Sequence, residues 1–367
     1  MYHNRCLAFL GVGLLAVSVK ATSCNATTPC PASAPCCSDF GFCGKDDFCL
    51  GGCNPLASHA LDSCKPAPLC QDATHTFADN SRILSNATFF DGNASEYDWV
   101  VDSGNIMNTN SSGGELALLL TEENRGTRIS STRYVHYGTI TATMKVSKWA
   151  GVVTAFITMS GIKDEIDWEF PGATNTEAQS NIFWQGEIPT GKNDGGVHGD
   201  LKDTFANYHD YTIDWQPETL TFKIDGQTVR TVKKSDRNSD GISKYPNTPS
   251  RVQMSLWPAG INSSAAGTVE WAGGMIDWNS ADYKAAGHYY ALVKSVTIKC
   301  SDPTKPAADM TSYVYGANQT TNTPSIAFSN SSTLLNGAAG FGPAAANIHV
   351  SLVVAAVVGL LGLVQFV

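Results

Sequence analysis

The segment from residue 219 to residue 232 constrains the fold more than any other part of this chain. Two runs of alternating side chains, residues 219–224 and 227–232, are separated by Asp225-Gly226. An Asp-Gly pair between alternating runs is typical of a tight β-hairpin, because both turn residues must adopt a positive φ. We therefore expect two antiparallel strands joined by a two-residue turn.

Several other segments carry strand patterns. Residues 139–146 show β-branched alternation, whereas residues 152–159 form a more continuous apolar run, as expected of a buried strand. We find no long segment with apolar residues at helical spacing, and the 33 glycines suit many turns. Short strands spread over residues 71–300 predict an all-β protein in which two sheets pack together.

The N-terminus predicts a signal peptide. Arg5 precedes mostly apolar residues 6–19, and Val19-Lys20-Ala21 offers a cleavage site after Ala21. A transmembrane anchor is the alternative, but the apolar run is short, so we expect residues 1–21 to be removed and the protein secreted. Seven Asn-x-Ser/Thr sequons support glycosylated surface loops, at Asn25, Asn86, Asn93, Asn110, Asn262, Asn318 and Asn330.

The cysteines define a small module. One of the 11, Cys6, lies in the signal peptide, and nine of the other ten fall between Cys24 and Cys70. Secretion makes disulfides the expected use of these cysteines, with a zinc site as the disfavoured alternative. We assign residues 22–55 to the module, residues 56–300 to a large domain, and residues 301–336, rich in Ser, Thr, Asn and Ala, to a stalk.

The C-terminus carries a second targeting signal. Residues 350–367 are almost all apolar and uncharged, which is long enough for a membrane span, and no Lys or Arg follows them. Small residues Asn336-Gly337-Ala338 and a spacer precede this run, which is the order of a GPI-anchor signal. We expect attachment at Asn336, with Gly337 as the alternative, and removal of residues 337–367. A true transmembrane helix is the other interpretation.

Charge and histidine content exclude some functions. The formal net charge of −9, without a Lys/Arg cluster, argues against nucleic-acid binding. His198 and His209 lack clustered partners, so we expect neither a metal site nor a cofactor.

Residues 163–170, Lys-Asp-Glu-Ile-Asp-Trp-Glu-Phe, carry the candidate chemistry. Side chains alternate along a strand, so Glu165, Asp167 and Glu169 share one face, and the apolar residues between them share the other. A row of like charges opposes folding, and such a break with local preference indicates a functional site. A solvated acidic strand edge or a calcium site is the alternative for this triplet.

The triplet suits retaining glycoside cleavage, which needs one ionised carboxylate as nucleophile and one protonated carboxyl as acid. Crowding raises the pKa of at least one carboxyl and keeps it protonated. Residues four apart on a strand have Cα atoms roughly 13 Å apart. Retaining enzymes hold the two carboxyl groups about 5 to 5.5 Å apart, so Glu165 and Glu169 must lean toward each other.

The sequence around these acids resembles glycoside hydrolase family 16, and more narrowly the fungal Crh chitin–glucan crosslinking transglycosylases. The resemblance covers roughly residues 64–300. It rests on residues 164–170, Gln179-Ser-Asn-Ile-Phe-Trp-Gln-Gly186, Tyr211-Thr-Ile-Asp-Trp215, Ser255-Leu-Trp-Pro-Ala-Gly260 and Gly267-Thr-Val-Glu-Trp-Ala-Gly-Gly274. It implies a concanavalin-like jelly-roll β-sandwich with a concave cleft. In this family pattern Glu165 is the nucleophile, Glu169 the general acid/base that also contacts substrate, and Asp167 their helper.

The resemblance also implies donor-sugar contacts at Gln253, Trp257 and Thr268, with Trp271 beside them. If residues 251–257 form a strand, Gln253 and Trp257 share a face, and Trp257 can stack on a sugar ring. The alternative is that these tryptophans lie in the core, where we place Trp168 and Trp215.

The cysteine module resembles a hevein-type chitin-binding domain, through Cys36-Cys-Ser-Asp-Phe-Gly-Phe-Cys-Gly44 and Phe48-Cys49. The resemblance implies that Ser38, Phe40, Phe42 and Phe48 bind N-acetylglucosamine. The usual eighth cysteine is not obvious, and one of the seven before residue 54 is expected to pair with Cys64, Cys70 or Cys300. A disulfide knot without a ligand is the alternative.

Together these features predict a retaining transglycosylase of the fungal cell wall, held at the outer membrane face by a GPI lipid. It would cleave a chitin donor and transfer it to a β-glucan acceptor. The alternatives are a retaining endo-hydrolase of chitin or β-1,3-glucan, and a non-catalytic chitin-binding wall protein.

Overall fold

The computed structural model describes residues 22–109, 113–188, 195–239, 241–320 and 323–335. The predicted signal peptide, the proposed GPI site at Asn336 and the C-terminal apolar run lie outside these residues. Within them, no helix combines the length and the apolar character needed to cross a bilayer.

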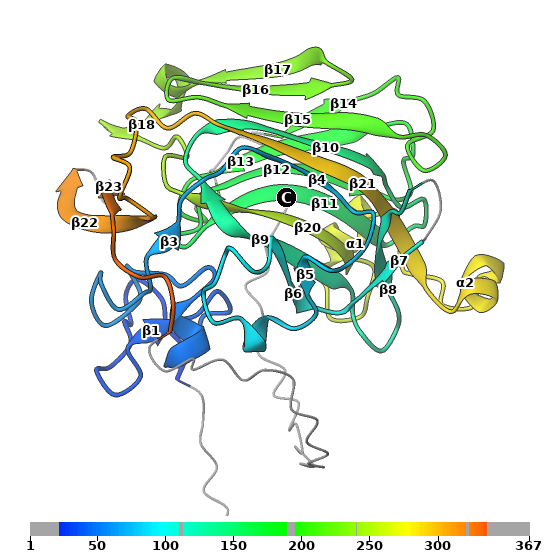
Figure 1. Ribbon diagram of the computed structural model, residues 1–367. Coiled ribbons are helices and arrows are strands. Elements are labelled where there is room, and N and C mark those ends of the chain that lie inside the picture. Colours follow the sequence, from blue (N-terminus) through cyan, green and yellow to red (C-terminus); the bar gives the residue numbers. More distant parts are fainter. Residues whose placement is uncertain (1–21, 110–112, 189–194, 240, 321–322, 336–367) are drawn as a thin grey trace, which may run out of the picture.

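Two eight-stranded sheets pack face to face and form the large domain (Figure 1). One sheet contains, in spatial order, β17 (Gln227–Lys233), β16 (Thr219–Ile224), β15 (His209–Trp215), β10 (Gly138–Lys145), β21 (Tyr289–Cys300), β8 (Leu116–Leu120) and β7 (Asn105–Asn108), with β4 (Ala73–Thr76) also paired to β21. The other contains β14 (Gly196–His198), β13 (Ala178–Phe183), β12 (Glu165–Pro171), β11 (Val152–Ser160), β20 (Ser250–Pro258), β9 (Thr127–Val135), β6 (Trp99–Ser103) and β5 (Ile83–Leu84). The predicted all-β sandwich is confirmed.

The core lies between the two sheets and follows the period of two residues. Along β10 the side chains of Ile140 and Met144 are fully buried, while the threonines between them face outward. Trp168 of β12 reaches across the core to the other sheet. Its ring lies edge-on to Phe222 with 5.2 Å between ring centres, and its Nε1 donates to the carbonyl of Thr212 at 3.3 Å. Trp168 and Trp215 are both buried, as predicted.

The predicted hairpin forms at β16 and β17. Asp225 and Gly226 lie between the strands with φ of 50° and 78°, the left-handed values that this turn requires. The Asp225 carboxylate also accepts from the backbone N–H of Asp210 at 2.9 Å and contacts Nδ1 of His209 at 2.7 Å. The turn is therefore tied to the neighbouring strand β15.

In the described part of the chain the helices are few and short, in agreement with the lack of helical spacing in the sequence. They are α1 (Ala266–Trp271), α2 (Ala281–Ala286) and the 3-10 helices η1 (Asp46–Cys49), η2 (Ala87–Phe89) and η3 (Lys234–Arg237). A small two-stranded sheet joins β18 (Asn238–Ser239) to β19 (Ile242–Ser243).

The predicted disulfide framework is confirmed. In the cysteine module, where β1 (Cys36–Cys37) pairs with β2 (Cys43–Gly44), the bonds are Cys24–Cys37, Cys30–Cys43, Cys36–Cys49 and Cys53–Cys64. The eighth cysteine of the module is thus Cys64, and the covalent frame runs to that residue. The fifth bond, Cys70–Cys300, lies in the large domain.

Residues 312–329 differ from the predicted stalk. They form a hairpin of β22 (Ser312–Thr320) and β23 (Thr323–Ser329), and β22 also pairs with β3 (Ala67–Pro68). Tyr313 is buried, and its hydroxyl donates to the carboxylate of Asp302 at 2.8 Å. The stalk prediction rests on the polar composition of the segment, which gives no weight to a few aromatic residues such as Tyr313. Figure 1 shows the hairpin beside the cysteine module, at one end of the sandwich.

Candidate active site

A buried aspartate anchors the start of β12. The carboxylate of Asp164 accepts from the hydroxyl of Thr248 at 2.7 Å and from the backbone N–H groups of Asn247 and Gln185, both at 3.1 Å. These bonds hold the turn between β11 and β12 against two distant loops. The strand that follows therefore begins in a fixed position.

The side chains of β12 divide between two faces as predicted. The apolar residues of the strand enter the core of the sandwich, at Ile166, Trp168 and Phe170. Glu165, Asp167 and Glu169 share the opposite face, on which the two glutamates are partly exposed and Asp167 is buried. One extended segment therefore presents three acids on the side of the sheet that faces away from the core.

The adjacent strand β13 provides partners for these acids. Asn181 lies directly opposite Asp167, and its Nδ2 donates to the Asp167 carboxylate at 3.0 Å. Gln179 lies opposite Glu169 in the same register. Sequence reasoning missed both residues as members of the site, although alternation along residues 179–183 would have placed them on one face.

Burial raises the pKa of all three acids, and repulsion from neighbouring carboxylates adds to it at Glu165 and Glu169. Burial, followed by the charge of Asp167, raises the pKa of Glu165 to about 8. Burial raises the pKa of Asp167 to about 7, against the lowering effect of its bond from Asn181. Burial and the charges of Asp167 and Glu165 raise the pKa of Glu169 well above its ordinary value. The carboxyl groups of this row therefore hold protons at a higher pH than carboxyl groups in water do.

The two glutamates differ in their surroundings. The charge of Lys163, two residues before Glu165, lowers the pKa of that carboxyl. The charges that act on Glu169 are both negative. In the part of the chain that the structure describes, Oε2 of Glu169 is buried without a hydrogen-bond partner. Glu165 is thus the easier of the two to ionise, and Glu169 the easier to keep protonated.

The predicted donor contacts come from β20 and α1. Along β20, Gln253 and Trp257 lie on the face opposite the core residues, as the alternation predicts; Gln253 is buried and Trp257 partly exposed. The indoles of Trp257 and Trp271 stack at 6.0 Å between ring centres. Nε1 of Trp271 donates to Gln179 at 2.9 Å, which connects α1 to the strand beside Glu169. The structure therefore brings the two tryptophans together near the acids.

Thr268 of α1 is 6% exposed. Among the described residues, its hydroxyl is buried without a hydrogen-bond partner, as is Oε2 of Glu169. The unpaired polar atoms of the predicted site thus include one hydroxyl and one carboxyl oxygen.

The predicted sugar contacts of the cysteine module surround a tight turn. The Ser38 hydroxyl accepts from the backbone N–H of Phe42 at 3.3 Å, and the ring of Phe48 packs over Gly44. Phe42 and Phe48 are half-buried, whereas Phe40 is 51% exposed. Among the described residues, the Sγ atoms of Cys24, Cys30 and Cys43 form a cluster of possible metal ligands, but all three are in disulfides.

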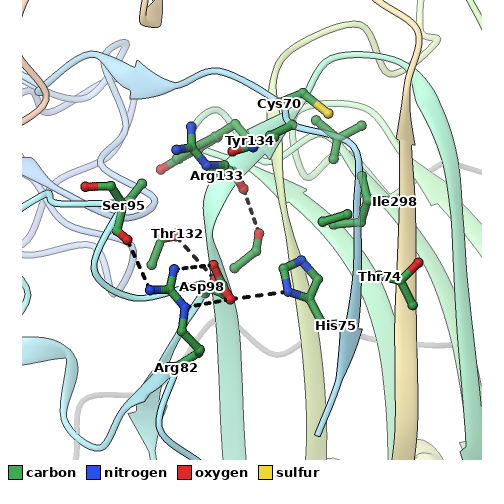
Figure 2. Close-up of a pocket in the computed structure, with 15 residues that line it drawn as sticks. Cys70, Thr74, His75, Arg82, Ser95, Asp98, Thr132, Arg133, Tyr134 and Ile298 are labelled. Atoms are coloured by element: carbon green, nitrogen blue, oxygen red, sulfur yellow. Dashed lines mark hydrogen bonds and ion pairs between the residues drawn. The ribbon is translucent and has the colours of Figure 1, made fainter.

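A cavity of about 390 Å³ lies elsewhere, beside β4 and β9 (Figure 2). In it the Asp98 carboxylate pairs with Arg82 at 2.7 Å and lies 3.6 Å from Nδ1 of His75. None of the predicted site residues lines this cavity. Its lining contains one acid, Asp98, so it offers no second arrangement of paired acids.

Comparison with known proteins identifies the family of the chain. Residues 93–273 match the glycosyl hydrolases family 16. Crh-like protein 2 of Aspergillus fumigatus is 44% identical over 71% of this chain and 58% of its own length. Congo red hypersensitive protein 2 of Saccharomyces cerevisiae is 39% identical over 88% of this chain and 69% of its own length.

A solved structure of the Crh5 transglycosylase in complex with NAG has the same fold. It superposes with a TM-score of 0.57 at 28% identity, over 72% of this chain and 95% of that one. The chain spans 58% and 63% of the length of two curated relatives, the Crh-like protein 2 above and Crh-like protein 3 of Botryotinia fuckeliana.

Proposed function

Because the chain belongs to glycosyl hydrolase family 16, among its Crh-like members, we propose that it is a retaining transglycosylase that cleaves chitin and transfers it to β-glucan. The observation that carries the proposal is the row of three carboxyl groups on the outer face of β12. Repulsion within this row opposes folding, which indicates that the row has a function. Glycosyl transfer is a reaction that needs two carboxyl groups side by side. The name of the solved Crh5 transglycosylase supports transfer as the reaction class.

The surroundings of the two glutamates support distinct roles. Glu165 acts as the nucleophile, because the charge of Lys163 favours its ionised form. Glu169 acts as the general acid, because the charges that act on it are negative and, among the described residues, its buried Oε2 has no hydrogen-bond partner. Asp167, held by Asn181, orients the nucleophile and shares the proton of the triad.

The reaction proceeds by two displacements. Glu169 donates its proton to the glycosidic oxygen while a carboxylate oxygen of Glu165 attacks the anomeric carbon. The glycosidic bond breaks, the leaving chain departs as an alcohol, and a glycosyl ester forms on Glu165. Glu169, now ionised, takes the proton of an acceptor hydroxyl whose oxygen attacks the same carbon. The ester breaks, Glu165 is released, and the two inversions give net retention.

The donor chain lies against β20 and α1. The stacked pair Trp257 and Trp271 offers an aromatic surface for the apolar face of a sugar ring. The unpaired hydroxyl of Thr268 can hydrogen-bond an N-acetyl or hydroxyl group of the donor. Gln253 is buried on the same face and packs beneath the donor, between these residues and the acids.

We also propose where the enzyme acts. A signal peptide over residues 1–21, seven sequons and a GPI-anchor signal at Asn336 would deliver it to the outer face of the fungal plasma membrane and to the cell wall. The anchor and the cysteine module would both raise its effective concentration at wall polysaccharide.

A labelled-acceptor assay tests the reaction. Wild type, Glu165→Gln and Glu169→Gln are incubated with chitin oligosaccharides and a fluorescent β-1,3-glucan oligosaccharide, and the products are separated by size. We expect label in longer chains with wild type, and a loss of at least about a hundredfold with either variant.

Other outcomes separate the remaining functions. Shortened chitin without labelled products would indicate a hydrolase. Chitin binding that is equal in all three proteins, without any product, would indicate a non-catalytic wall protein.

A further inference from the structure

Asp39 joins the cysteine module to the catalytic domain. It lies between the predicted sugar contacts Ser38 and Phe40, yet its side chain is only 6% exposed. Its carboxylate contacts Nη2 of Arg128 at 2.6 Å and Nζ of Lys163 at 2.5 Å, and Lys163 also donates to its carbonyl at 3.1 Å. The predicted sugar-binding loop therefore contacts the large domain through a buried carboxylate that pairs with two partly exposed cations.

The two cations belong to the sheet that carries the acids. Arg128 is on β9, and Lys163 lies in the turn immediately before Glu165. Burial raises the pKa of Asp39, but the charges of Lys163 and Arg128 outweigh it and hold the pKa well below the ordinary value. Arg128 also pairs with Asp102 at 3.2 Å. Ion pairs to a buried carboxylate stabilise a fold only when the charged groups are held at close distances. The pairs at Asp39 therefore indicate that the module has one defined position on the large domain, its seat.

Close backbone contacts complete the seat. The N–H of Gly52 donates to the Tyr134 hydroxyl of β9 at 2.9 Å. A Cβ at Gly161 would lie 2.4 Å from the carbonyl oxygen of Cys53, so this position has no room for a side chain. Contacts of three kinds, ionic, hydrogen-bonded and steric, thus hold the module on one side of the catalytic face.

Phe40 lies at the end of a row that begins at the acids. The register places Glu169, Ala155, Ser255 and Arg128 side by side on β12, β11, β20 and β9. Three inter-strand steps make this row about 14 Å long. The Phe40 ring lies 5.1 Å from the Arg128 guanidinium and is half exposed. An aromatic surface therefore stands beyond β20, the strand that carries Gln253 and Trp257.

We propose that the cysteine module is a fixed part of the catalytic site, in which Phe40 continues the donor-binding face. One chain of β-1,4-linked N-acetylglucosamine would then contact Trp257 and Phe40 at the same time. This inference rests on the proposed function, because it takes chitin as the donor. It makes the module a determinant of donor length, and not a separate anchor on another chain. Asp39 is the positioning residue that keeps Phe40 in place.

Donor-length kinetics test the inference with the full-length enzyme. Wild type, Phe40→Ala, Asp39→Asn and Asp39→Glu are assayed with chitin oligosaccharides of increasing length and one labelled acceptor. We expect Phe40→Ala to raise KM about fivefold for long donors, the size of one aromatic contact, and to leave short donors unchanged. Asp39→Asn should do the same, because it removes the negative charge that Arg128 and Lys163 share, and Asp39→Glu, which keeps that charge, should raise KM less. Phe89→Ala, at a phenylalanine that is 76% exposed on η2, is the matched control.

The outcomes separate this inference from the proposed function. If wild type neither cleaves nor transfers any chitin oligosaccharide, the proposed function itself is wrong. If wild type is active but Phe40→Ala matches it at every donor length, or loses the same factor at every length, Phe40 does not continue the donor face. The inference would also be wrong if Phe40→Ala lost binding to insoluble chitin but kept the wild-type KM for every donor. The module would then bind a separate chitin chain.

Discussion

At the scale of single residues, the active site opposes the stability of the fold. Burial raises the pKa of Glu165, Asp167 and Glu169, and repulsion adds to it at the two glutamates. Within the described residues, one hydrogen bond between side chains, from Asn181 to Asp167, supports an ionised form among them. The site is therefore prepared for proton transfer at a cost in folding free energy.

Glu165→Gln should stabilise the protein while abolishing its activity. The pKa of Glu165 rises from 4.5 to about 8 on folding, so the folded state binds the proton more strongly, and stability falls as pH rises through that interval. The uncharged amide escapes this loss. We expect a gain of about 1 to 2 kcal/mol at about pH 7, which vanishes near pH 4, where both proteins are uncharged at this position.

Urea unfolding of both proteins at the two pH values measures the gain. Glu123→Gln, at an exposed glutamate, is the matched control and should change little. Equal stability of wild type and Glu165→Gln at the higher pH would show that folding does not raise the pKa of the Glu165 carboxyl.

At the scale of elements, β12 separates stability from chemistry by its two faces. Its apolar residues fill the core against the opposite sheet, and its acids lie on the other face, where the two glutamates are partly exposed. Alternation makes this division unavoidable, because a shift of one residue in register would exchange the faces. A substitution in this strand should therefore affect either unfolding or turnover, according to its face.

Ile166→Ala tests this division from the inner face. Ile166 is fully buried, so we expect a loss of about 2 to 5 kcal/mol in the free energy of unfolding from the cavity that remains. The activity of the molecules that stay folded at low temperature should be close to that of wild type. Ile166→Val should lose only about 0.5 to 1.5 kcal/mol. A large fall in kcat without a fall in stability would contradict the division.

At the scale of the whole molecule, distant segments of the chain are fastened to one another. The Cys70–Cys300 disulfide joins residues 230 apart in the sequence and links the start of the large domain to the end of β21. The seat around Asp39 and the pairing of β22 with β3 bring both ends of the described chain onto the sandwich. These links leave the module and the hairpin of β22 and β23 as parts of one folded unit.

Cys70→Ser/Cys300→Ser should destabilise the large domain by about 3 kcal/mol, because the bond restricts a long loop in the unfolded chain. Denaturant unfolding followed by tryptophan fluorescence measures the loss, since the tryptophans lie in the large domain. Cys53→Ser/Cys64→Ser, which opens a loop of separation 11, is the control and should lower the same transition less. Equal losses in the two variants would contradict a dominant role for loop length.

Local patterns in the sequence were sufficient for part of this picture. The hairpin at Asp225-Gly226, the common face of Glu165 and Glu169 and the burial of Trp168 follow from turn chemistry and from a period of two, which act between near neighbours in the chain. The disulfide class followed from cysteine content in the same way.

Only the tertiary structure decided which distant residues meet. Asn181 contacts Asp167 through strand pairing, Cys53 bonds to Cys64, and Asp39 pairs with Arg128, which lies 89 positions later in the chain. Such contacts depend on register and on the packing of separate elements, and a single sequence carries no local signal for either. Alternation along the strand therefore determined that the three acids would share a face, whereas the charges and hydrogen bonds that distinguish them come from the assembled sandwich.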